Sequence, residues 1–441
     1  MFSDRHFMYS QPYRLAVGAW VPALLPAKLE QNILYISMRN QPYPAKASAM
    51  PQIFRLFLIF LYLGCTSFGG PAAHLGYFRA AFVQQRKWLT EQQYADLVAL
   101  CQFMPGPASS QVGLSLGLLR GGYLGALAAW LGFTLPSAVL LTLFALGLNQ
   151  WQGAALAGVV HGLKIAAVAV VAQAVWQMGR QFCRSTVGCL LMLFACVGSL
   201  WLPGIAAQII MMLAAAGIGA LLMNSGVAGG AHDVLPKVLS RRAGLMWLIL
   251  FALLLIGLPW LAADHPAGLT ALADKLYRTG ALVFGGGHVV LPVLQAQTVP
   301  LWLSEHIFLA GYGAAQAVPG PLFTLAAFLG AAAQPEQAVL WAAVATLAIF
   351  LPSFLMVFGL LPFWSALSRY PRARAMLNGI NAAVVGILLA ALYQPVWTSA
   401  VQQWTDALWA VLAFGLLMSG RVPAWLLVLS AAMLGAVVGL V

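Results

Sequence analysis

The chain has 441 residues, of which 62% are hydrophobic and only 7% are charged. Soluble domains carry about 25% charged residues, so this composition excludes an ordinary soluble protein. A net charge of +12 would suggest a nucleic-acid partner in a soluble domain. Here most Lys and Arg stand between apolar runs, where they fix membrane topology. We therefore expect an all-α polytopic membrane protein, surrounded by lipid and without nucleic acid.

The first 50 residues are mixed in character, with Pro, Lys and Arg scattered through them, and they show no secretory signal. We expect a cytoplasmic leader over 1–50, although Met38 and Met50 also offer start positions. Beyond the leader, apolar runs such as 121–148 and 244–263 exceed the roughly 18 residues that a membrane helix needs.

One apolar run begins near Phe54 and ends in "FGGPAAH" at 68–74, and "FGGGH" follows at 284–288. Consecutive Gly and Pro residues interrupt a helix. Irregular backbone inside a bilayer is tolerated only within the protein or beside a water-filled cavity. The two motifs therefore predict two helix breaks in the protein interior.

These motifs belong to an internal repeat, because short stretches recur in the same order at offsets of 214 to 217 residues. The pairs are "FGG" at 68 and 284, "WLTE" at 88–91 with "WLSE" at 302–305, "CQFMPGP" at 101–107 with "AQAVPGP" at 315–321, "TLPS" at 134–137 with "FLPS" at 350–353, and "HGLK" at 161–164 with "NGIN" at 378–381. The sequence predicts a tandem duplication, with repeats over 51–235 and 267–441 and a linker over 236–266 that holds one membrane helix.

The loops indicate that the two repeats have opposite orientation. Loop 179–186 is basic whereas its counterpart at 394–405 has no Lys or Arg, and loop 365–375 is basic whereas 148–153 has none. Because cytoplasmic loops collect Lys and Arg, equivalent loops should lie on opposite sides of the membrane. Six crossings in each repeat plus the linker helix give an expected total of thirteen.

With that count, the basic cluster of Arg79, Arg86 and Lys87 falls outside, against the positive-inside rule. Either the Pro-Gly-Pro segment is re-entrant and the count changes, or these charges attract an anion. Arg120 and Lys164 also stand in apolar surroundings. We expect both residues to attract the anion or to couple its movement. The simpler interpretations are that Arg120 is a loop residue and that Lys164 extends its amine to the membrane surface.

Helices that start after the two Pro-Gly-Pro motifs would aim unpaired N–H groups and positive dipole ends at the breaks. Proline loses nothing in a first helical turn, and glycine lets an oxyanion approach the backbone. We therefore predict an anion cradle. Its expected residues are Gly69, Gly70, Pro71, His74, Gln102, Pro105, Gly106, Pro107 and Ser109 in the first repeat, and Gly285, Gly286, Gly287, His288, Gln316, Pro319, Gly320, Pro321 and Thr324 in the second, with Ser110 and Gln111 as further donors.

His74 and His288 would bind the anion, carry protons, or simply pack. The stretch 90–103 predicts an amphipathic helix that begins with a Thr90 and Gln93 capping box. Glu91 and Asp96 would lie on its solvated side, unless one of them carries a coupled proton.

Several motifs are absent from the sequence. It shows no CxxC pair, zinc-type cluster, nucleotide-binding glycine loop or HExxH motif. We expect the five cysteines to pack, with no metal, no cofactor and no enzymatic activity. Without a nucleotide site, energy for uphill movement would come from an ion gradient or from the solute's own gradient.

The block at 67–138, "SFGGPAAHLGYFRAAFVQQRKWLTEQQYADLVALCQFMPGPASSQVGLSLGLLRGGYLGALAAWLGFTLPSA", is joined by "FGGGHVVLP" at 284–292 and "AVPGP" at 317–321. Together these stretches resemble the chromate ion transporter family in its long two-domain form, and the resemblance extends from Pro51 onward. The family's FGGP, PGP and LPS motifs correspond to Phe68–Pro71, Pro105–Pro107 and Leu135–Ser137, and to Phe284–Gly287, Pro319–Pro321 and Leu351–Ser353, where Gly287 replaces the motif proline.

The resemblance implies export of chromate across the bacterial inner membrane, driven by the proton motive force and giving chromate resistance. Sulfate shares the charge and shape of chromate, so we expect it to compete, and a transporter of sulfate or a related oxyanion is the alternative. A membrane oxidoreductase is disfavoured because cofactor motifs are absent, and a scaffold because the breaks would lack a reason. The sequence leaves a homodimer open.

Overall fold

The computed structural model describes residues 49–150, 154–202, 204–223, 238–284, 289–364 and 371–440, and across these ranges the chain is helical without strands. The first repeat holds α3 (Ala49–Thr66), α4 (Gly70–Phe78), η2 (Arg79–Gln85), α5 (Glu91–Phe103), α6 (Ala108–Gln150), α7 (Ala154–Phe182), α8 (Thr186–Trp201) and α9 (Ile205–Leu222). The linker holds α10 (Arg241–Ala262). The second repeat holds α11 (Leu269–Leu282), α12 (Val290–Thr298), α13 (Glu305–Ala317), η4 (Leu322–Thr324), α14 (Leu325–Ala333), η5 (Pro335–Gln337), α15 (Ala338–Leu360), η6 (Leu361–Phe363), α17 (Pro371–Ala391), η7 (Leu392–Trp397), α18 (Thr398–Ala400), α19 (Trp404–Met418) and α20 (Ala424–Leu440).

The duplication is visible in the order of the elements. In each repeat two short helices flank a glycine motif, two more flank Pro-Gly-Pro, and four further helices follow. Helix α6 leaves helical geometry at Gly121 and Gly122, which matches the interruption between α14 and α15. The expected capping box is confirmed, because Thr90 Oγ1 accepts from Gln93 N and Gln93 Oε1 accepts from Thr90 N, both at 3.1 Å.

Both hairpins of the first repeat return to the side of the molecule from which they start. Arg120, just before the α6 break, donates from Nη2 to the Trp88 carbonyl at 3.2 Å and stacks over the Trp88 ring. Gln52, at the start of α3, donates from Nε2 to the Arg120 carbonyl at 2.6 Å. The start of α3 and both ends of the α5–α6 hairpin therefore lie together. In the second repeat Trp302 donates from Nε1 to the Ala267 carbonyl at 2.9 Å, which joins the equivalent ends.

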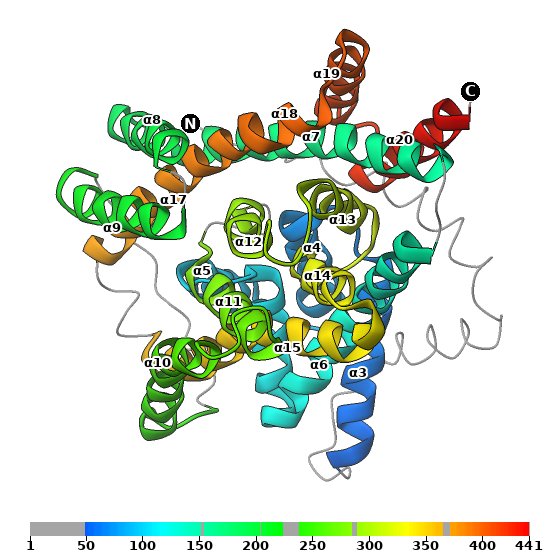
Figure 1. Cartoon of the computed structure of the whole chain (residues 1–441). Helices are drawn as coiled ribbons and strands as arrows, with labels where there is room; N and C mark the ends of the chain where they lie inside the picture. The colour runs from blue at the N-terminus through cyan, green and yellow to red at the C-terminus, as the bar shows by residue number, and fades with distance from the viewer. Residues whose placement is uncertain are drawn as a thin grey trace.

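The long helices of each repeat pack against the last helices of the other repeat. Helix α7 packs against α19 and α20, whereas α17 packs against α8 and α9, so that α8 and α9 lie at one end of the α7–α17 layer and α20 at the other (Figure 1). Small residues allow close approach, because a methyl group at Gly162 would overlap the Ala431 carbonyl and one at Gly379 the Ala215 carbonyl. Such contacts replace hydrophobic burial as the source of helix association in lipid.

The same contacts fix the relative orientation of the repeats. Gly158 lies against Gly435 and Gly162 against Ala431, so α7 and α20 run antiparallel. Short connections join α7 to α8 and α8 to α9, so α9 runs in the direction of α7, and α20 likewise runs in the direction of α17. Because α20 opposes α7, α17 also opposes α7. The expected inverted orientation of the repeats is therefore confirmed.

Basic residues gather on the side where α3 and α5 begin, which we call the basic side. Tyr123, Trp247 and Phe358 form an aromatic cluster there, and it brings together the start of the second part of α6, the start of α10 and the end of α15. Tracing the chain through these contacts places the following residues at this side: Arg55, Arg79, Arg86, Lys87, Arg120, Arg180, Arg184, Arg241, Arg242, Arg372, Arg374 and Arg421.

The path of the chain shows that the predicted outside position of Arg79, Arg86 and Lys87 is wrong. They follow α4, whose hairpin with α3 returns to the basic side, so they share a side with the other basic ends. The physical reason is that the glycine motif at 68–71 forms a re-entrant hairpin of its own, in addition to the Pro-Gly-Pro segment whose re-entrance the sequence leaves open. The number of crossings is therefore lower than the expected thirteen. Among the described residues, Lys164, Lys275 and Arg278 are the basic residues that lie elsewhere.

We predict that Gly162→Ala weakens the packing between α7 and α20. The added methyl group would overlap the Ala431 carbonyl, and overpacking of this kind costs about 1–3 kcal/mol. Thermal unfolding of the purified protein in detergent should show a lowered midpoint. Gly179→Ala on the same helix is the matched control, because a methyl group there meets nothing within 4 Å. Equal midpoints for the two variants would contradict the predicted packing.

Candidate functional site

Each Pro-Gly-Pro motif is bound by the main chain of the other repeat. The amide of Gly106 donates to the Val283 carbonyl at 2.7 Å, and the amide of Gly320 donates to the Ser67 carbonyl at 2.9 Å. Val283 and Ser67 each stand immediately before the Phe-Gly-Gly sequence of their repeat. The two hydrogen bonds are thus related by the duplication, and all four broken segments meet in the interior.

The serines of the two LPS motifs pack against the same glycines. Gly106 has φ +111°, and a Cβ there would lie 2.6 Å from Ser353 Oγ. Gly320 has φ +102°, and a Cβ there would lie 2.9 Å from Ser137 Oγ. The left-handed backbone and the close serine both require glycine at these positions. Ser137 and Ser353 come from opposite repeats to the glycines they touch, so this contact is also reciprocal.

Helix starts converge on the place where Gly106 and Gly320 bind the other repeat, which we call the crossing point. Helix α4 begins after Gly69, which has φ +100°, and carries Pro71 in its first turn. Helix α6 begins directly after Pro107, and after Pro321 the 3₁₀ turn η4 leads into α14. The first amides of such helices have no helical acceptor, and their dipoles present partial positive charge. The arrangement offers main-chain donors to an anion.

His74 joins two of these helix starts. Its Nε2 lies 3.1 Å from the Ser67 carbonyl and its Nδ1 lies 3.4 Å from Ser109 Oγ. Because a carbonyl only accepts, Nε2 carries a proton, and in the neutral imidazole Nδ1 then accepts from the Ser109 hydroxyl. The side chain is 1% exposed, and its ring meets the edge of Phe133. His74 therefore holds the start of α4 against the start of α6 in this conformation.

The first turn of α6 supplies buried polar side chains. Ser109, Ser110 and Gln111 are all buried, and Gln111 donates from Nε2 to the Pro105 carbonyl and to Ser353 Oγ. Ser110 Oγ, Gln111 Oε1, Ser67 Oγ and Thr134 Oγ1 have no hydrogen-bond partner among the described residues. Buried polar atoms without a partner are rare in folded proteins and suggest a role in binding a solute.

The polar side chains are distributed unequally between the repeats. At the offset of the Pro-Gly-Pro motifs, Ser109 corresponds to Phe323 and Gln111 to Leu325. Thr324, the counterpart of Ser110, is buried and donates from Oγ1 to the Pro321 carbonyl at 2.6 Å. The second repeat therefore contributes mainly its backbone, and the first repeat contributes most of the side-chain chemistry.

The structure brings many of the expected residues together. Gly69, Gly70, Pro71, His74, Pro105, Gly106, Pro107, Ser109, Pro319, Gly320, Pro321 and Thr324 lie at or beside the crossing point. Gln102 is exposed on α5, and Gln316 is half-buried on α13 with its Nε2 enclosed. Gly285, Gly286, Gly287 and His288 lie outside the described residues.

The expected anion-attracting residues lie away from the crossing point. Arg79 makes a two-pronged ion pair with Glu91 at 2.8 and 3.1 Å, and these hydrogen bonds raise the pKa of the Arg79 guanidinium. Arg86 donates to the Ala81 carbonyl, and Lys87 is exposed. Together with Arg120 they lie at the basic side, where the first-repeat hairpins begin and end. Lys164 is buried on α7 among a separate set of polar groups.

One expectation about α5 is wrong. Glu91 is exposed as expected, but Asp96 is only 5% exposed, and Gln92 Nε2 lies 3.4 Å from its Oδ1. The helix turns Asp96 toward the protein because Tyr94, Leu97 and Leu100 bury the neighbouring face. Ser67, Ser137 and Ser353 were not singled out as site residues from the sequence. The repeated "LPS" stretches were the signal that could have found two of them.

A duplicated, inverted helical bundle with re-entrant breaks at its centre defines a membrane transport protein, multi-pass in the bacterial inner membrane. The chromate transporter family matches residues 54–220 and 270–436, one match in each repeat, and the chain belongs to this family. It is 29% identical to a probable chromate transport protein of Synechococcus elongatus over 76% of this chain and 82% of that protein. It is 28% identical to a chromate transport protein of Pseudomonas aeruginosa (77% and 79% covered) and 26% identical to one of Cupriavidus metallidurans (80% and 87% covered). No solved structure matches the chain.

We predict that Gly106→Ala destabilises the crossing point and that Ser353→Ala partly restores it. The substitution combines a strained φ with a contact to Ser353 Oγ, which the second change removes. Gly204→Ala is the control for backbone strain alone, because Gly204 has φ +130° with nothing within 4 Å. Strain of this kind costs about 1–3 kcal/mol, and the clash should add to it. Thermal midpoints that rank Gly106→Ala above Gly204→Ala would contradict the assignment.

Proposed function

We propose that the protein exports chromate from the cytoplasm, that proton entry drives this export, and that cells expressing it resist chromate. The proposal rests first on the reciprocal binding of Gly106 and Gly320, which gathers helix starts from both repeats around one point. Main-chain amides and helix dipoles suit a doubly negative oxyanion. Hydroxyls of Ser110 and Thr324 and the amide of Gln111 stand beside them.

The charge distribution supports the outward direction. By the positive-inside rule the basic side faces the cytoplasm. A surface lined by one sign of charge raises the local concentration of oppositely charged solutes, so chromate would gather there. The membrane potential, negative inside, also favours outward movement of an anion by about 2.3 kcal/mol per charge per 100 mV.

The inverted repeats supply a route to alternating access. The hairpins of the first repeat reach the crossing point from the basic side, and those of the second repeat reach it from the opposite side. Rocking of one repeat against the other would expose the same helix starts to either side in turn. In the present conformation Ser109, Ser110, Gln111 and Thr324 are at most 3% exposed, which suits an occluded state.

A transporter for sulfate or a related oxyanion is the second candidate. Main-chain donors recognise charge and tetrahedral shape, which chromate and sulfate share, and so they do not separate the two. We expect sulfate to compete for the site. Slow growth of a deletion strain on limiting sulfate would favour sulfate import over chromate export.

The proposal also covers catalysis and partner molecules. Within the described ranges no group of three His, Cys, Asp or Glu residues is placed to hold a metal ion. We propose transport without catalysis or cofactor. Lipid would contact the exposed apolar surface of helices such as α10, because only 6% of its apolar 18-residue stretch is buried within the protein. A homodimer stays a prediction.

Transport in everted membrane vesicles tests the proposed export. Vesicles energised to an acidic interior should accumulate labelled chromate, and an uncoupler should abolish this accumulation because the proton gradient is lost. Vesicles from cells without the protein are the control. Equal accumulation with and without the uncoupler would contradict proton coupling, and accumulation only in right-side-out vesicles would contradict export.

We predict that Ser110→Ala raises the KM for chromate with little change in protein stability. A hydroxyl that donates to an anion contributes about 1.5–3 kcal/mol, which corresponds to a loss of affinity of about ten- to a hundredfold. Ser199→Ala is the matched control, since Ser199 Oγ is also buried without a described partner but lies on α8. An unchanged KM for Ser110→Ala would remove this residue from the cradle.

A further inference from the structure

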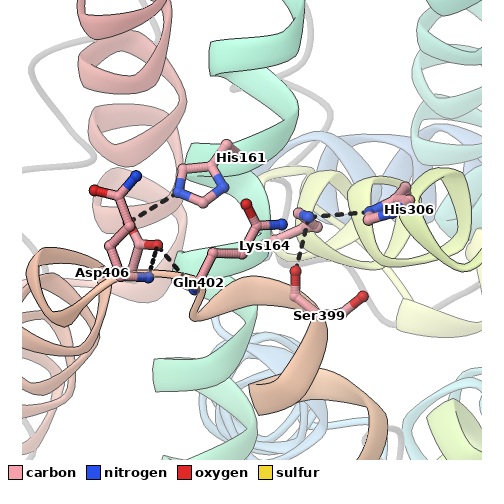
Figure 2. A network of polar contacts seen from close by, with 7 residues as sticks. His161, Lys164, His306, Ser399, Gln402 and Asp406 are labelled. Carbon is pink, nitrogen blue, oxygen red and sulfur yellow. Dashed lines mark hydrogen bonds and ion pairs between the residues drawn. The ribbon is translucent and has the colours of Figure 1, made fainter.

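A second group of titratable side chains, of which Lys164 and Asp406 are buried, lies away from the crossing point, at the side opposite the basic side. Lys164 Nζ on α7 lies 3.1 Å from His306 Nδ1 on α13 and donates to the Ser399 carbonyl on α18 at 2.9 Å. One turn earlier on α7, His161 Nε2 lies 2.9 Å from Asp406 Oδ1 on α19 (Figure 2). We call these four ionisable residues the α7 cluster.

The carboxylate of the α7 cluster is held in the ionised state by its hydrogen bonds. Asp406 Oδ2 accepts from the amides of Gln402 and Gln403 at 3.0 Å, and Oδ1 faces His161. With three hydrogen bonds to one carboxylate, Asp406 serves as a fixed negative charge at the start of α19. The groups able to change charge are then the two histidines and the lysine.

The contact between Lys164 and His306 depends on the protonation of His306. When the lysine ammonium donates to Nδ1, that nitrogen must hold a lone pair, so His306 is neutral. A proton that binds Nδ1 takes this lone pair, and the N–H···N hydrogen bond to Lys164 breaks. Protonated His306 and Lys164 are then two positive charges side by side at the N-terminus of α13, where the helix dipole disfavours a cation.

Two carboxylates and a second histidine also face this contact. Glu305 of α13 and Asp406 of α19 interact electrostatically with Lys164, and His161 lies on its own helix. Lys164 is 4% exposed whereas His306 is exposed. A proton can therefore reach the histidine from the aqueous side while the lysine stays enclosed.

The other copy of these positions lacks ionisable groups. By the duplication, His161 and Lys164 correspond to Asn378 and Asn381, and His306 corresponds to Gln92. Gln92 Nε2 instead lies 3.4 Å from Asp96 Oδ1 of its own helix. The charged contact is thus particular to this copy, and it connects α7 to α13, the helix that leads into Pro319-Gly320.

We propose that His306, opposed by Lys164, is the site at which the driving proton binds from the outer side. Its protonation breaks the hydrogen bond between Lys164 of α7 and His306 of α13 and loosens the hairpin that carries the second Pro-Gly-Pro motif. This inference rests on the proposed proton-driven export of chromate.

The test compares His306→Gln with His265→Gln in everted vesicles. Glutamine keeps an acceptor for Lys164 and is the residue that the other repeat carries, but it cannot bind a proton. His265 is an exposed histidine between α10 and α11 on the same side and serves as the control. Two quantities are measured: chromate–chromate exchange without a gradient, and accumulation under an imposed pH gradient.

We expect exchange by His306→Gln to stay within about twofold of the parent. For each coupled proton, one pH unit of gradient raises the accumulation ratio about tenfold in the parent and in His265→Gln, and His306→Gln should lose this dependence. Accumulation by His306→Gln that still follows the gradient overturns the inference. Loss of exchange as well assigns His306 to the chromate path and also overturns it. A parent protein insensitive to the gradient refutes the proposed proton coupling itself.

Discussion

The architecture depends on two hydrogen bonds, from the Gly106 amide to the Val283 carbonyl and from the Gly320 amide to the Ser67 carbonyl. Four chain segments leave helical geometry in the middle of a lipid-embedded protein, where water cannot satisfy their polar groups. Each repeat satisfies part of the other repeat's broken backbone. Neither half closes its break alone in this structure, because each of the two hydrogen bonds needs the oppositely oriented repeat.

The packing around the breaks follows from the same constraint. Hydrogen bonds between segments as short as these require close backbone approach, and small residues provide it: Gly106 against Ser353, and Gly320 against Ser137. Further out, glycine on α7 and on α17 allows each long helix to lie against the last helices of the other repeat. Each repeat thus contacts the other repeat in two places, at the crossing point and in the α7–α17 layer that covers it (Figure 1).

Much of this arrangement could be predicted from the sequence, because duplication makes weak signals repeat. The breaks, the capping box at Thr90 and the inverted orientation all follow from local patterns that occur twice or from loop charge. The sequence could not assign Arg79, Arg86 and Lys87 to a side, because hairpin closure depends on the contact between Arg120 and Trp88. Nor could it show which polar residues meet. Hydrogen bonds across more than 200 residues, such as Gln111 to Ser353, leave no periodic trace in the sequence.

In the proposed mechanism, duplication followed by divergence also separates anion binding from switching, two tasks that the repeats of a symmetric protein would have to share. The first repeat keeps Ser109 and Gln111 where the second has Phe323 and Leu325, so the side chains that can face an anion come mainly from one half. The ionisable groups of α7 likewise have amide counterparts in α17. The solute would be bound mainly by the first repeat, whereas the change of charge would act on a hairpin of the second repeat. Binding and switching would then lie on different sides of the interface between the repeats. Coupling then needs no direct contact between the two, because Gly320 of the switched hairpin is hydrogen-bonded to Ser67, whose carbonyl also accepts from His74 beside Ser109.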